Sequence, residues 1–145
     1  MKDDGSLRGI KRSGIIVRGK LIQGGLGRWL AVATWMALIF FLSAQPALPS
    51  SGEGWLDDLI HVASHFVEYG VLATLASRAI FADGRRTRAR MALVLSWCVV
   101  YAVGDEWHQG FVPGREASVV DLAVDVLGVL GGLRVYIWVA KGDAI

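Results

Sequence analysis

The chain has 145 residues, of which 54% are hydrophobic and 19% charged, and its mean hydropathy is +0.47. A soluble domain of this size usually carries about 25% charged residues. This apolar composition excludes an intrinsically disordered chain, and the single cysteine, Cys98, excludes an intramolecular disulfide scaffold. No zinc ribbon, phosphate-binding loop or dinucleotide-binding fingerprint is present. The composition therefore predicts a small integral membrane protein.

Four long apolar segments predict transmembrane helices, because a hydrocarbon core about 30 Å thick needs about 20 helical residues. They run from about Leu26 to Ala44, Leu59 to Phe81, Met91 to Trp107 and Ser118 to Ala140. Only the first and third meet a strict requirement for few or no charges, since the other two carry ionisable residues at one end. No segment alternates apolar and polar residues as the strands of a membrane barrel do. The predicted fold is all-α, a small bundle of four transmembrane helices.

Basic residues predict the orientation, since cytoplasmic loops are enriched in lysine and arginine. Those before the first span are Lys2, Arg8, Lys11, Arg12, Arg18, Lys20 and Arg28; those between the second and third are Arg78, Arg85, Arg86, Arg88 and Arg90; the end of the chain adds Arg134 and Lys141. Only Arg115 falls on the other side. We therefore expect cytoplasmic termini, outer loops at 45–58 and 108–117, a basic tail over 1–25, a membrane domain over 26–140 and a short tail over 141–145.

The basic N-terminal segment has other interpretations. It could begin a secretory signal cleaved after Ala44, but the basic region is long, the apolar run exceeds 15 residues, and Leu42 is not small. Its charges could contact anionic lipid headgroups, although a tail that only fixes the topology accounts for the same pattern. Nothing in the sequence predicts binding to nucleic acid.

The ionisable residues of the spans gather on the outer side. The second span contributes His61, His65 and Glu68; the third ends in Asp105, Glu106, His108 and Gln109; the fourth begins with Ser118, Asp121 and Asp125. Spacings of three and four residues place such groups on one face of a helix. An ionised side chain at membrane depth costs at least about 2.5–3.5 kcal/mol, so it faces protein or water. Three polar stripes at one depth predict a polar cavity open to the outside.

The loop after the third span contains Pro113-Gly114, which suits the central positions of a type II turn. Such a turn would hold Arg115 over the cavity. A guanidinium binds phosphate or carboxylate through two parallel hydrogen bonds. Arg115 is therefore either an anion clamp or the counter-charge of the neighbouring acids.

Structural roles explain several of the same residues. Asp57 or Asp58 suits the N-terminus of the second span as a cap, and Ser118 or Asp121 suits that of the fourth. Gly128 and Gly132 form a small-xxx-small pair that favours internal packing over a dimer contact. The whole polar cluster could also be an ion-paired plug that fixes the packing of the helices.

The motifs resemble those of the VanZ-like family. Residues 105–115 (DEWHQGFVPGR), followed by Ser118, Asp121, Asp125 and Gly128, are similar to the family pattern D-E-x-H-Q-x-F-x-P-G-R-x-x-S-x-x-D. Residues 43–46 (SAQP) and 65–72 (HFVEYGVL) are similar to its other motifs, and the resemblance covers roughly residues 28–135. It implies a small multi-pass protein of the bacterial cytoplasmic membrane. The founding member is linked to resistance to the glycopeptide teicoplanin, and most members have no assigned activity.

Two functions from different classes fit the cluster. An enzyme would use His65, Glu68, Asp105, Glu106, His108, Asp121 and Asp125 as catalytic groups, with Gln109, Arg115 and Ser118 binding substrate. Of these, His65, Asp105, His108 and Asp121 are the candidate ligands of a divalent metal, which would assist hydrolysis of a lipid-linked phosphate or envelope precursor. A non-enzymatic protein would instead bind or shield an envelope component in the same pocket. A proton or ion transporter is disfavoured, because no acid or histidine lies in the inner half of the second and fourth spans.

Overall fold

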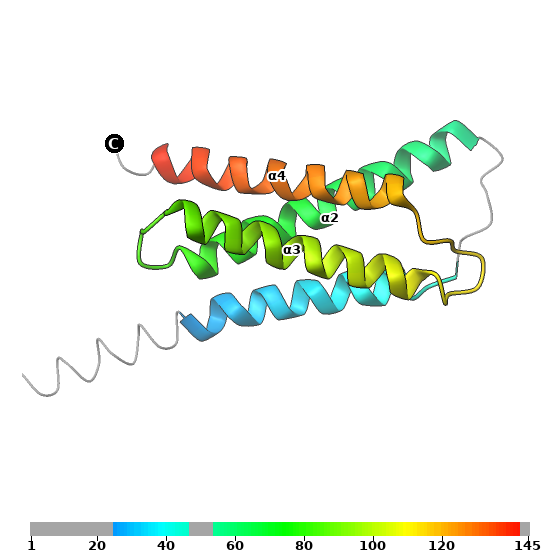
Figure 1. The fold of residues 1–145 in the computed structure, drawn as a ribbon, viewed down its shortest axis with the longest axis horizontal. Helices are drawn as coiled ribbons and strands as arrows, with labels where there is room; N and C mark the ends of the chain where they lie inside the picture. The colour runs from blue at the N-terminus through cyan, green and yellow to red at the C-terminus, as the bar shows by residue number, and fades with distance from the viewer. Residues whose placement is uncertain (1–24, 47–53, 143–145) are drawn as a thin grey trace, which may run out of the picture.

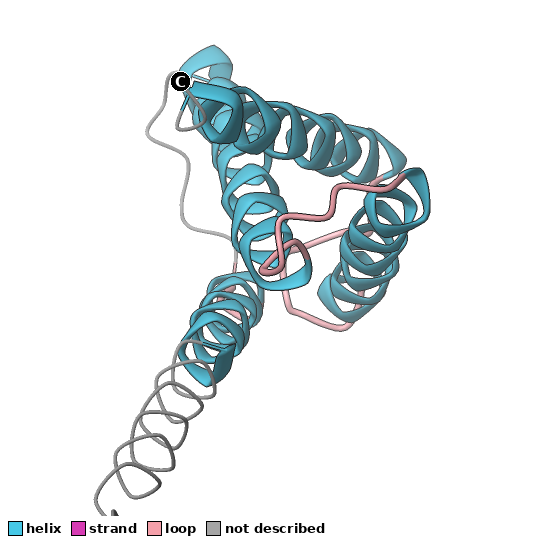
Figure 2. Cartoon of the chain, turned by 90° about the vertical axis from the view of Figure 1, so that its left-hand side faces the viewer, coloured by secondary structure: helices cyan, strands magenta, loops and turns pink. Residues whose placement is uncertain are grey.

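The protein is described by a computed structural model over residues 25–46 and 54–142. A first helix, Gly25–Ser43, is followed by α2 (Gly54–Ile80), α3 (Arg88–Gln109) and α4 (Val119–Gly142). The described residues form no strand, as Figure 2 also shows, so the all-α prediction is confirmed. The basic tail before residue 25, residues 47–53 of the first expected outer loop and the last three residues lie outside the described residues.

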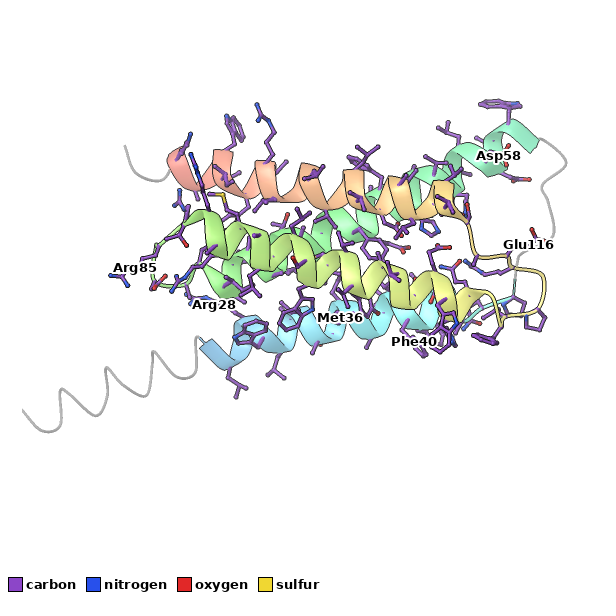
Figure 3. The ribbon with its side chains drawn as sticks, in the orientation of Figure 1. Arg28, Met36, Phe40, Asp58, Arg85 and Glu116 are labelled. Carbon is purple, nitrogen blue, oxygen red and sulfur yellow. The ribbon has the colours of Figure 1, made fainter. Side chains whose placement is uncertain are left out.

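The four helices run along the long axis of the molecule, and consecutive helices point in opposite directions (Figure 1). The first helix begins at one end of the bundle, where α4 ends and the α2–α3 loop turns. Arg28 and Arg85 lie at this end, which we call the basic end, whereas Asp58 and Glu116 lie at the opposite, acidic end (Figure 3). The segregation of charge expected from the sequence is therefore present in the folded chain.

Three of the described helices are long and apolar enough to cross a membrane: the first helix, α2 and α4. Helices α2 and α4 thus qualify despite their ionisable residues, whereas α3, the expected third span, is not among the three. Helix α3 begins with Arg88 and Arg90 and ends with Asp105, Glu106 and His108. Its uncharged middle, residues 91–104, covers only about 21 Å at 1.5 Å per residue, whereas α2 and α4 carry fewer charges for their length.

Helices α2 and α4 approach each other closely because glycines line their contact. A Cβ atom added to Gly132 would lie 2.0 Å from the carbonyl oxygen of Gly70, and one added to Gly128 would lie 2.4 Å from that of Phe66. Thr74 supports the contact, since its Oγ1 donates to the carbonyl of Gly132 at 3.2 Å. The expected role of this glycine pair in internal packing is therefore confirmed.

Helix α2 begins at Gly54, five residues before the expected start at Leu59. Asp57 lies in its first turn, where a carboxylate interacts favourably with the positive end of the helix dipole. The acidic residues expected to mark this terminus thus lie inside the helix, and the additional turn extends the helix to Trp55, whose side chain is exposed.

The loop between α2 and α3 is held by one acid. The Oδ1 atom of Asp83 accepts hydrogen bonds from the backbone N–H of Arg85 at 3.1 Å and from the guanidinium of Arg90. The hydrogen bond from Arg90 is the main cause that lowers the pKa of Asp83 to about 2. Gly84 follows with a φ of 78°, which glycine adopts without strain. This loop turns the chain sharply at the basic end.

Candidate functional site

Two histidine–aspartate pairs join α2 to α4 near the acidic end. His61 Nε2 lies 3.1 Å from Asp121 Oδ2, and His65 Nδ1 lies 2.9 Å from Asp125 Oδ1. The pairs are one helical turn apart, and the two imidazole rings are 4.6 Å apart. Their surroundings differ, because the His61 side chain is 45% exposed whereas those of His65 and Asp125 are 6% and 1% exposed. The deeper pair is therefore shielded from solvent.

Glu106 brings a third helix to the deeper pair. Its Oε2 accepts a hydrogen bond of 2.8 Å from the backbone N–H of Ser118, which fixes the start of α4 beside α3. Ser118 also caps α4, since its Oγ accepts from the backbone N–H of Asp121 at 3.2 Å. Ser118, one of the residues expected to bind substrate, thus has a structural role at the N-terminus of α4.

Two carboxylate oxygens in this region are buried and have no hydrogen-bond partner among the described residues: Glu106 Oε1 and Asp125 Oδ2. Each belongs to a side chain whose other oxygen is hydrogen-bonded to protein. A buried polar atom without a partner costs about 1–3 kcal/mol. Two such atoms on the contacting helices α3 and α4 are consistent with a site that receives a cation, a proton or a polar ligand.

Geometry suitable for a metal occurs in two groups of described residues. His65, Glu106 and Asp125 are all buried, and one donor atom of each lies within 4.8 Å of the others. The second group consists of His61, His65 and Asp121 and is more exposed. Imidazole nitrogen with carboxylate oxygen is a donor set that suits zinc or manganese. Of the four metal ligands expected from the sequence, His65 and Asp121 belong to these groups, whereas Asp105 and His108 do not.

Asp105 lies in a separate network that connects α3 to the first helix. Its Oδ1 accepts a hydrogen bond of 2.7 Å from Ser43 Oγ, and its Oδ2 accepts one of 3.2 Å from Gln109 Nε2. All three side chains are buried. Both oxygens of this carboxylate are therefore satisfied by protein, unlike those of Glu106 and Asp125.

Arg115 extends this network to the end of the first helix. The type II turn expected at Pro113-Gly114 is confirmed by a hydrogen bond of 3.1 Å from Arg115 N to Val112 O and by a φ of 78° at Gly114. The guanidinium donates to Gln109 Oε1 at 3.2 Å and to the carbonyl oxygens of Gln45 and Leu42 at 3.0 and 3.4 Å. These neutral acceptors indicate that Arg115 fastens the loop to the end of the first helix.

The two remaining candidate residues lie at the sides of the cluster. His108 stacks on Phe40 of the first helix, with ring centroids 4.5 Å apart, and its buried Nε2 has no hydrogen-bond partner among the described residues. Glu68 is half-buried one turn below His65, and its carbonyl oxygen accepts from Trp35 Nε1 at 2.9 Å. Neither residue belongs to the metal-compatible groups.

An apolar groove of about 690 Å³ lies between the first helix and α3 and reaches the side of the polar cluster. Its lining includes Met36, Phe40, Trp97 and Val100 and ends at Asp105. Met36 and Phe40 are labelled on the first helix in Figure 3. The groove therefore connects the apolar middle of the bundle with the polar groups at the acidic end.

Sequence reasoning missed the roles of two residues. His61 belongs to the outer pair, and the signal was available, because the four-residue spacing of His61 and His65 matches that of Asp121 and Asp125. Ser43 stood out only as part of the family motif at residues 43–46, and nothing in that motif pointed to Asp105, which lies 62 residues away in the chain.

The chain was compared with known proteins and families. A family model described as VanZ/LLP1 matches residues 28–140, which cover nearly the whole of the four helices and every candidate residue. No curated protein and no solved structure matches the chain. The chain therefore belongs to the VanZ/LLP1 family and is a VanZ-like membrane protein.

Proposed function

We propose that the protein crosses the bacterial cytoplasmic membrane four times, with α3 as the fourth span and both termini in the cytoplasm. The support is the separation of charge: Arg28 and Arg85 lie at one end of the bundle, and Asp58 and Glu116 at the other (Figure 3). The polar ends of α3 contact protein, because Asp105 and Glu106 are hydrogen-bonded within the bundle. The polar site would then open on the outer face.

The proposed function of this site is to bind and act on a component of the cell envelope. The observation that supports it best is the pair of buried oxygens, Glu106 Oε1 and Asp125 Oδ2, beside the His65 imidazole. Acids that served only as a packing plug would be expected to have all their oxygens paired, as Asp105 has. Buried oxygens without partners on α3 and α4, next to a histidine of α2, are a typical starting point of a ligand site.

His65, Glu106 and Asp125 would hold a divalent cation, since one ligand atom of each converges and each of the two carboxylates has one oxygen without a protein partner among the described residues. Such a cation would supply Lewis acidity toward a phosphoryl oxygen. A hydrogen bond donated by His65 Nδ1 to Asp125 Oδ1 would fix the imidazole ring and leave Nε2 as the nitrogen for a ligand. The outer pair of His61 and Asp121 would exchange protons with solvent, because His61 is exposed.

The substrate class that fits these features is a lipid-linked phosphate. The apolar groove between the first helix and α3 has room for part of an alkyl or prenyl chain, and it ends at Asp105 next to Glu106. A polar headgroup at the acidic end and an apolar chain along the groove would match the two environments. The reaction would be hydrolysis of the phosphate ester or anhydride.

Metal analysis and a hydrolysis assay test this proposal on the full chain purified in mild detergent. We expect about one zinc or manganese ion per chain and release of phosphate from a short prenyl diphosphate. The variants Asp125→Asn and Glu106→Gln should lose both the bound metal and the release of phosphate. Asp58 is an exposed acid at the same end of the bundle, so Asp58→Asn should keep both. Absence of bound metal after incubation with both cations would contradict the metal-assisted mechanism.

A non-enzymatic binding or shielding protein is the second candidate, and the satisfied network of Asp105, Gln109 and Arg115 favours it. This second candidate function predicts that the prenyl diphosphate binds to the wild type without turnover.

The link to teicoplanin resistance that the family implies is tested in cells. Deletion of the gene should lower the minimal inhibitory concentration of teicoplanin, and expression of the Asp125→Asn variant should not restore it.

A further inference from the structure

A second pocket lies at the basic end, far from the candidate site. It has a volume of about 490 Å³ and lies between the first helix, α2 and α4, with Arg28, Thr74, Arg78, Phe81, Ala82, Val135, Tyr136, Val139 and Ala140 along its wall. Two arginines from different helices thus face one pocket whose lining contains no acid. The sequence explains Arg28 and Arg78 only as basic residues that set the orientation of the chain in the membrane, and the fold brings them together at this pocket.

A third guanidinium lies beside the pocket. Arg86 Nη2 donates a hydrogen bond of 3.0 Å to the carbonyl oxygen of Ala140, which is part of the lining. The Nε atom of Arg86 is buried and has no hydrogen-bond partner among the described residues. Two guanidinium groups therefore line the pocket and a third is hydrogen-bonded to its wall, and this positive charge favours an anionic ligand.

The apolar part of the wall indicates what kind of anion fits. Val135 and Val139 are 54% and 48% exposed on the outside of α4, where they continue the wall of the pocket toward the surroundings of the bundle. A free inorganic anion would leave these side chains without a partner. An amphipathic ligand with an acyl chain would cover them while its phosphate contacts Arg28 and Arg78.

We propose that Arg28 and Arg78 form a binding site for the phosphate headgroup of an anionic phospholipid at the basic end of the bundle. Basic pockets between transmembrane helices are suited to such headgroups, and each arginine near the membrane surface contributes about a fivefold increase in affinity for an anionic lipid. The site differs from the candidate site in location, in charge and in ligand. It does not depend on the proposed hydrolytic function.

Native mass spectrometry of the full chain in mild detergent tests this site, with phosphatidylglycerol as the probe. Phosphatidylcholine with the same acyl chains and inorganic phosphate are the two comparison ligands. We expect the wild type to retain phosphatidylglycerol at least about fivefold better than phosphatidylcholine, and an excess of inorganic phosphate should not displace it. Equal retention of the two lipids would overturn the proposal, and displacement by inorganic phosphate would show a site for the free ion instead.

Variants locate the site on the protein. Arg28→Gln and Arg78→Gln should each weaken retention of phosphatidylglycerol about fivefold. Arg85→Gln removes the same charge from the loop at the same end and does not line the pocket, so it should retain the lipid as the wild type does. Circular dichroism and gel filtration establish that each variant is folded. An equal loss in Arg85→Gln would overturn the proposal, since it would show attraction by net charge alone.

Discussion

The Nδ1 atom of His65 lies 2.9 Å from Oδ1 of Asp125, inside the bundle, and these two residues from α2 and α4 are 60 positions apart in the chain. One turn away, His61 and Asp121 form the same type of contact with much greater exposure. Because both pairs consist of a histidine and an aspartate and differ in exposure, a comparison of the two shows how burial changes the contribution of such a pair to stability.

Removal of the acid from each pair should affect stability unequally. We expect Asp125→Ala to lower the free energy of unfolding by about 3 kcal/mol or more, because it leaves a buried histidine without its partner. Asp121→Ala should cost no more than about 1 kcal/mol, because His61 is accessible to solvent. Unfolding in mixed micelles of mild and denaturing detergent measures both values. Equal losses would contradict the difference in burial.

The close contact between α2 and α4 should not tolerate a methyl group. Gly132→Ala would place its Cβ against the backbone of Gly70, which cannot move without separating the helices. Overpacking of this kind costs about 1–3 kcal/mol. Gly104→Ala is the matched control, since nothing lies within 4 Å of the added atom. If both variants unfold at the same detergent fraction, the contact is looser than the structure indicates.

Arg115→Lys tests whether this residue fastens the loop or binds an anion. A lysine ammonium cannot reproduce the planar set of donors that contacts Gln109, Gln45 and Leu42. We expect faster hydrogen exchange in residues 110–118, whereas binding of the prenyl diphosphate should stay within about twofold of the wild type. Loss of that binding with an unchanged exchange pattern would support the anion clamp instead.

The crossing of the membrane by α3 can be tested with single cysteines on either side of it. In a Cys98→Ser background, Glu116→Cys should react with a membrane-impermeant maleimide in intact cells. Arg85→Cys should react only after permeabilisation. The two positions lie at opposite ends of the bundle (Figure 3). Labelling of both cysteines in intact cells would exclude the fourth span.

The α2–α3 loop should be sensitive to acid through Asp83. Its hydrogen bond with Arg90 lowers the folded-state pKa to about 2, below that of the unfolded chain. The contact therefore stabilises the loop above the unfolded-state pKa of about 3.9, and this contribution is lost as the pH falls from about 4 toward 2. Hydrogen exchange of residues 81–87 should rise over that range in the wild type and be independent of pH in Asp83→Asn, after correction for the intrinsic exchange rate. A wild-type rise that persists in the variant would contradict this account.

The sequence by itself determined the helical class, the separation of charge between the two ends and the turn at Pro113-Gly114. These properties depend on interactions of residues with their surroundings or with near neighbours in the chain. Each charged residue in an apolar segment raises the free energy of membrane insertion by itself, and a turn requires only four consecutive residues. The exception was α3, whose uncharged middle is shorter than its apolar appearance suggests.

Only the tertiary structure decided which polar residue meets which. Asp105 and Glu106 are adjacent in the chain, but successive residues on a helix point about 100° apart. Asp105 therefore joins Ser43 of the first helix, whereas Glu106 binds the start of α4 and lies near the buried histidine of α2. These contacts join residues far apart in the chain, and they depend on how closely the glycines let α2 and α4 approach, a distance that no local pattern in the sequence contains.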